Sequence, residues 1–81
     1  MNNRTPTLEA VNQAKAVADF KFLAACLLED DYGISSGKKD ELLAMGKATG
    51  YGLIGDFLEL DATLGRWVSA DNAALIKYVG L

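Results

Sequence analysis

The chain has 81 residues, of which 51% are hydrophobic, and its 11 acidic and 8 basic side chains give a net charge of −3. A chain of this length makes one domain, residues 1–81, and buries only about 60% of the surface that its unfolded form exposes. Nucleic-acid binding rests mainly on Lys and Arg at phosphates, so the negative charge argues against a nucleic-acid partner. Chains near this size often gain further burial by self-association or by docking on another protein.

The numbers of cysteine and histidine residues limit the disulfides and metal sites that the chain can form. Cys26 is the single cysteine and there is no histidine, which excludes an internal disulfide and a zinc site made of Cys and His. Residues 1–6 lack the apolar stretch of a secretory signal, and the most apolar window, residues 16–28, is too short to span a bilayer. We therefore expect a cytoplasmic protein that does not insert into membranes.

Apolar spacing predicts an all-α fold, a small bundle of three or four helices with a long first helix. That helix is predicted to begin at Thr5 or Thr7 and to run to about Asp31. It carries two apolar lines on roughly opposite sides, given about 3.6 residues per turn. The lines are Leu8, Val11, Ala14 or Lys15, Ala18, Phe22 and Ala25, and then Ala16, Phe20, Leu23 and Leu27.

A helix that is apolar nearly all round is usually buried on every side. Three short partner helices can hardly achieve this, so the first helix is either central in the bundle or shares a surface with another chain. We expect a homodimer, and its predicted interface consists of Phe20, Phe22, Leu23 and Leu27.

Three shorter helices complete the predicted bundle, because no run of residues alternates apolar and polar for the length of a strand. They are expected over about 37–48 after a Ser35 or Ser36 cap, over 51–64 before Gly65, and from a Ser69 cap to Gly80. Four glycines flank the connection between the first two of these helices. They predict a tight turn with close helix packing, in preference to a flexible hinge; they are Gly46, Gly50, Gly52 and Gly55.

The residue types in the chain argue against a catalytic site and against a metal site. Asp30 and Glu41 are spaced like the ends of an EF-hand loop, but the positions between them lack the required ligands. Nucleophilic catalysis by Cys26 would need a base, and no histidine exists. Carboxylate pairs such as Asp56 with Glu59 are typical of a solvated helix face. We name no catalytic residue, cofactor or metal, and expect a protein that is not an enzyme.

The main alternative is a DNA-binding transcriptional regulator with a helix-turn-helix over residues 41–58. Gly50 fits the turn, and Gly46 is the small residue expected four positions earlier. The second helix, however, has Asp56 and Glu59 where apolar anchors belong, and phosphates would repel these acids. An enzyme subunit whose site is completed by another chain is a third reading.

The preferred interpretation is a small non-catalytic interaction module that binds and modulates another protein, as an adaptor, antagonist or regulatory subunit. Short chains of this kind are often encoded by phages or other mobile elements. The residues predicted to bind that protein are Asp30, Asp31, Tyr32 and Trp67, because an acidic rim beside aromatic anchors suits a basic protein surface. The alternative for Trp67 is a core residue that closes the bundle.

Overall fold

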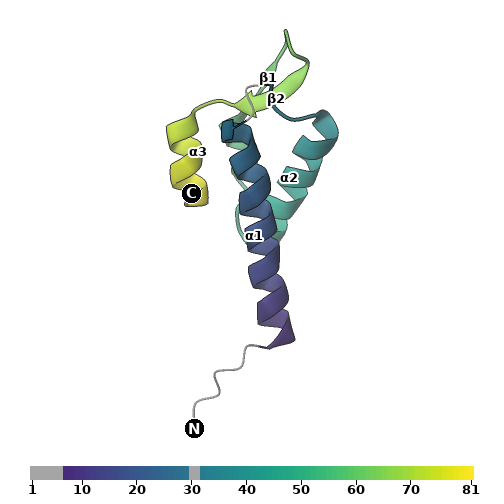
Figure 1. Cartoon of the computed structure of the whole chain (residues 1–81), viewed down its shortest axis with the longest axis vertical. Helices are drawn as coiled ribbons and strands as arrows, with labels where there is room; N and C mark the ends of the chain where they lie inside the picture. Colours follow the sequence, from purple (N-terminus) through teal and green to yellow (C-terminus); the bar gives the residue numbers. More distant parts are fainter. Residues whose placement is uncertain (1–6, 30–31) are drawn as a thin grey trace.

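The computed structural model describes residues 7–29 and 32–81, and within them the chain is mostly helical with one small hairpin (Figure 1). The predicted helical architecture with a long first helix is confirmed, but the all-α class is wrong. In chain order the described elements are helix α1 (Leu8–Glu29), helix α2 (Ser36–Thr49), the 3-10 turn η1 (Ile54–Phe57), strand β1 (Leu58–Asp61), strand β2 (Arg66–Ser69) and helix α3 (Asn72–Val79).

The ends of α1 and α2 follow the capping residues in the sequence. The Thr7 hydroxyl accepts a hydrogen bond from the backbone N–H three residues later (3.0 Å), whereas Thr5 and Asp31 lie outside the described residues. Ser35 caps α2 in the same way, at 3.2 Å. Gly50 ends that helix with φ of 91°, a left-handed conformation that glycine adopts without strain.

The predicted helix over residues 51–64 is wrong. After α2 the chain makes the short turn η1 and then enters β1, which pairs antiparallel with β2. The Asp61 carboxylate accepts hydrogen bonds from the N–H groups two and three residues later, at 2.9 and 3.0 Å, and Gly65 takes φ of 65°. This local turn chemistry reverses the chain where the prediction had a helix end.

The residue that caps α3 also differs from the prediction. Asp71 is the N-cap, and its carboxylate accepts from the N–H of Ala74 at 3.2 Å, whereas Ser69 belongs to β2. Strand pairing extends to Ser69, so the helix begins later than local capping preference suggests.

Removal of this cap gives a first prediction. Asp71→Ala should lower the free energy of unfolding by about 1 kcal/mol, because the first turn of α3 loses its side-chain acceptor. Urea unfolding followed by circular dichroism measures the loss. Asp71→Asn keeps an acceptor oxygen and is the control; an equal loss in both variants would contradict the capping role.

A backbone bridge joins the α1–α2 connector to the hairpin. Ile34 N–H donates to the Trp67 carbonyl at 2.8 Å, and Trp67 N–H donates to the Ile34 carbonyl at 2.9 Å. Gly33, with φ of 72°, brings the connector against β2 so closely that a β-carbon there would collide with the Trp67 carbonyl. Strand β2 therefore lies between the connector and β1.

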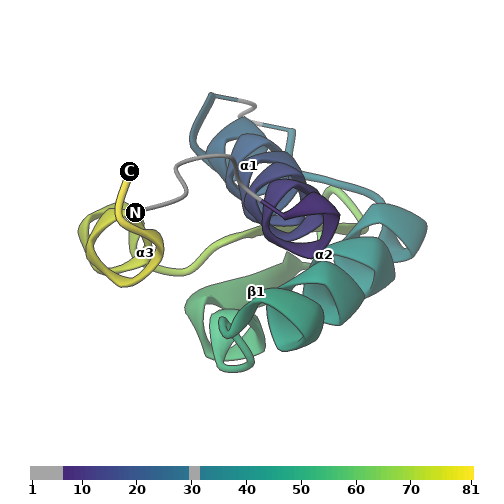
Figure 2. The same cartoon turned by 90° about the horizontal axis from the view of Figure 1, so that it is seen from below.

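The core lies between the C-terminal half of α1 and the elements around it, and α2 and α3 flank α1 (Figures 1 and 2). Phe20 is fully buried, and its ring stacks on Tyr51 with centroids 4.8 Å apart. Gly46 allows this approach, since a β-carbon there would lie 2.7 Å from the Tyr51 carbonyl oxygen. The close packing predicted for the glycines is confirmed at Gly46. Other buried residues are Ala24, Leu27, Ile34, Leu42, Ile54, Leu58, Leu75 and Val79.

Candidate protein-binding surfaces

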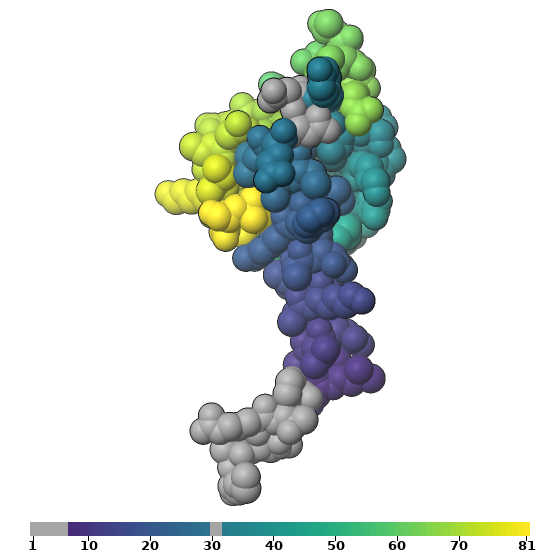
Figure 3. Space-filling model, in the orientation of Figure 1, coloured from purple at the N-terminus to yellow at the C-terminus, as the bar shows by residue number. Residues whose placement is uncertain are grey.

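Helix α1 projects well beyond the other described elements. Its N-terminal half forms a narrow extension in the space-filling view (Figure 3), and every residue from 8 to 15 is exposed. The helix begins to contact the rest of the fold only in its second half. A helix segment without tertiary cover depends on its own propensity or on a partner for stability.

The structure assigns the two apolar lines of α1 to opposite environments. The line with Phe20 and Leu27 enters the core. The other line faces outward, where the exposed fractions are 76% for Leu8, 47% for Val11 and 75% for Phe22. We call this outward line the α1 stripe; it consists of Leu8, Val11, Lys15, Ala18, Phe22 and Ala25.

The four residues predicted for a dimer interface are therefore split. Phe20 and Leu27 lie in the core of a single chain, Leu23 is half-buried at its edge, and Phe22 alone of the four is exposed. Homodimer formation itself stays a prediction. Of the residues in the α1 stripe, the predicted interface included Phe22 alone.

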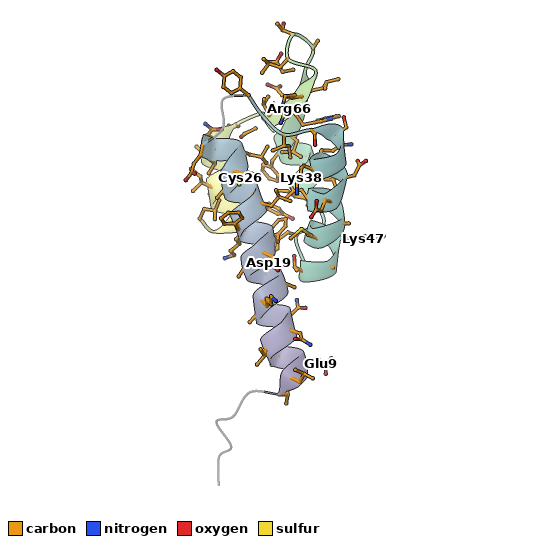
Figure 4. All side chains as sticks on the ribbon, turned by 45° about the vertical axis from the view of Figure 1, so that its right-hand side comes forward. Glu9, Asp19, Cys26, Lys38, Lys47 and Arg66 are labelled. Carbon is orange, nitrogen blue, oxygen red and sulfur yellow. The ribbon has the colours of Figure 1, made fainter. Side chains whose placement is uncertain are left out.

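A groove between α1 and α2 adjoins the α1 stripe at Phe22. It has a volume of about 300 Å³ and its floor and walls combine apolar and charged side chains. Phe22 belongs to both the stripe and the groove. Figure 4 labels two of the charged groups, Asp19 on α1 and Lys38 on α2, and Lys38 also pairs with Glu41 at 3.4 Å. The lining residues are Asp19, Phe22, Leu23, Lys38, Glu41 and Met45.

A second hollow, of about 450 Å³, lies beside α3 and is lined by Phe57, Ala74, Lys77 and Tyr78. The Tyr78 ring stacks on Phe57 with centroids 4.6 Å apart and meets Tyr51 edge-on at 5.8 Å. These aromatic rings are thus already packed against one another. They join η1, α3 and the core, which gives them a structural role.

The predicted acidic and aromatic contact site is only partly described. Asp30 and Asp31 lie outside the described residues, and Tyr32 is 71% exposed. The half-buried Trp67 packs against the core, its indole N–H donates to Ser36 Oγ at 3.3 Å, and Lys39 Nζ lies 4.6 Å from the ring centroid. These contacts favour the alternative in which Trp67 closes the core.

The helix-turn-helix alternative lacks its second helix in the structure. The segment after Gly50 contains turn residues, the four-residue η1 and then strand β1. Asp56 and Glu59, which the prediction placed on a DNA-facing helix, are exposed in the turn and on the strand.

The described residues also bear on metal binding and on membrane insertion. Over residues 7–29 and 32–81, no three His, Cys, Asp or Glu side chains gather closely enough to hold a metal ion. Among the described helices, none combines the length and apolarity needed to cross a membrane. Comparisons with models of protein families, with curated proteins and with solved structures give no match.

Proposed function

We propose that this chain is a non-catalytic protein-interaction module that binds a helix along the α1 stripe. The observation that supports this most directly is the α1 stripe itself: a row that is apolar except for Lys15, lies opposite the core face, and is exposed from Leu8 to Phe22. Single exposed apolar side chains are ordinary in proteins. A row at spacings of three and four residues on one uncovered helix face is the pattern by which helices recognise other helices.

Phe22 is the proposed anchor of this surface. Its ring is exposed, it lies at the junction of the stripe and the α1–α2 groove, and large aromatic side chains contribute disproportionately to binding. The charged groups beside it, Asp19 and Lys38, would fix the orientation of the bound helix more than its affinity. An adaptor, an antagonist or a regulatory subunit would each act by covering part of another protein in this manner.

A paired substitution tests the proposal. Phe22→Asp should weaken capture of a bound protein by about thirtyfold or more, the effect expected for a hot-spot residue. Leu53→Asp is the matched control, because Leu53 is 62% exposed but lies in the turn after α2, away from the stripe. Proteins retained from the native cell would be identified by mass spectrometry, purified and titrated by calorimetry against each variant.

The two variants give opposite results if the proposal holds. Binding that depends on Phe22 but not on Leu53 supports the stripe as the functional surface. Equal binding by the wild type and Phe22→Asp, with both chains folded by circular dichroism, would overturn it.

A further inference from the structure

We infer that the helix bound along the α1 stripe is α1 of a second copy of this chain, in antiparallel orientation. The inference rests on the proposed function of the stripe and names its partner. It starts from the spacing of the stripe residues, which alternates between three and four over residues 8–25. This is the heptad spacing of helices that pair along a continuous seam, and at about 1.5 Å per residue the seam is roughly 27 Å long.

Lys15 selects the orientation. It lies in the middle of an otherwise apolar stripe and is exposed. In a parallel pair in register, Lys15 would face the partner's Lys15, and the two ammonium groups would repel each other. An antiparallel pair places each Lys15 against the partner's Ala18, whose small side chain leaves room for the lysine stem to reach past it.

The same register sets the larger side chain of each pair against a smaller one along the seam. Leu8 would face the partner's Ala25, and Val11 would face the partner's Phe22, with the reciprocal contacts generated by twofold symmetry. A parallel pair would instead stack Phe22 on the partner's Phe22 and Ala18 on the partner's Ala18. The antiparallel order therefore fills the seam more evenly, which close packing favours.

Charge complementarity supports the same arrangement. Asp19 is exposed one turn after Lys15, and neither side chain forms an ion pair with any described residue. In the antiparallel register Lys15 lies beside the partner's Asp19, and the twofold symmetry repeats this contact on the other side of the centre of the seam. Two intermolecular ion pairs would thus replace solvated charges.

The fold leaves space for this partner. Helices α2 and α3 flank α1 (Figure 2). Helix α2 comes near the stripe at the groove that Phe22 and Met45 line. The stripe itself is exposed or half-buried along its length. A second helix can therefore lie along α1 without displacing α2 or α3.

Sedimentation equilibrium of the full chain at micromolar concentrations tests the self-pairing. We expect a species of twice the 8.7 kDa chain mass. Phe22→Asp and Leu8→Asp should each give a monomer, since both residues are exposed and their replacement leaves the core intact. Lys15→Asp and Asp19→Lys should each weaken self-association by about fivefold or more, because two repulsive contacts replace two attractive ones. An equimolar mixture of these two variants should restore the dimer.

The orientation is measured by pulsed electron resonance with a spin label at position 9, in a Glu9→Cys, Cys26→Ser chain. The antiparallel register puts position 9 about 15 residues from its counterpart along the seam, so the labels should be about 25 Å apart. A parallel pair would bring them to about 10 Å, the separation of packed helices.

The outcomes separate this inference from the proposed function. A clean monomer at about 0.1 mM would overturn the self-pairing, since wild-type association that weak cannot use the full seam. Phe22-dependent capture of a different protein would still uphold the proposed function in that case. A short label distance would overturn the antiparallel orientation, and a dimer insensitive to both Phe22→Asp and Leu8→Asp would overturn self-pairing along the stripe.

Discussion

Phe20→Ala should lower the free energy of unfolding by about 3–5 kcal/mol, the usual cost of truncating a buried aromatic side chain. Phe20 is fully buried, stacks on Tyr51 and lies 3.1 Å from the position that a β-carbon on Gly46 would take. Because natural domains are stable by only about 0.05–0.15 kcal/mol per residue, this loss removes much of the fold's stability.

Phe22→Ala is the matched control, two residues away on the outward face of the same helix. Its effect on monomer stability should stay within about 0.5 kcal/mol, as for most exposed sites. Urea unfolding at a concentration below any self-association measures both variants. If Phe20→Ala proves too unstable to study, Phe20→Leu should still lose measurable stability while its Phe22→Leu counterpart does not. Equal losses at the two positions would show that the faces of α1 are assigned incorrectly.

Gly33→Ala should cost about 2–4 kcal/mol, from two additive causes. Gly33 has φ of 72°, which L-residues adopt only with strain, and a β-carbon there would collide with the Trp67 carbonyl and lie 2.8 Å from Val68 Cγ1. Relief of this clash requires the connector to move away from β2. The Ile34–Trp67 bridge would then lengthen or break.

Gly52→Ala is the control for this substitution, because the space around that glycine is open within 4 Å and its φ lies outside the left-handed region. Its effect should be near zero or slightly stabilising, since alanine restricts the unfolded chain. Trp67 is the single tryptophan, so its fluorescence reports the bridge directly. An unchanged emission spectrum together with a loss below about 1 kcal/mol in Gly33→Ala would contradict the strain argument.

Both ends of α2 were predictable because capping is a local interaction. Ser35 and Gly50 act through groups three or four residues away, so the sequence around each one contains the whole signal. The hairpin was not predictable on the same basis. Leu58 and Leu60 alternate with acidic residues over four positions only, too few to indicate a strand, and with Leu64 they also fit a helix face. Pairing with residues 66–69 decides in favour of the strand.

The candidate surface was predictable only as a surplus of apolar residues on α1. Both lines are similarly apolar, and nothing within the helix distinguishes Phe20 from Phe22. Their environments are decided by the approach of Tyr51 and of the elements that follow it, which is a tertiary event. The α1–α2 groove could not be predicted from the sequence either, since it forms only when Phe22 and Met45 are brought together from separate helices.

The bare N-terminal half of α1 links binding to local folding. Helical segments of fewer than about 12–15 residues without tertiary contacts are marginally stable in water. Residues 8–15 should therefore unfold and refold rapidly in the free chain. The stripe is complete only while this segment is helical. The apparent dissociation constant therefore equals the intrinsic one divided by the fraction of molecules in which the segment is helical. The backbone amides of this segment should exchange with deuterium rapidly in the free chain and slowly once the stripe is covered, which makes exchange a direct readout of occupancy for any partner.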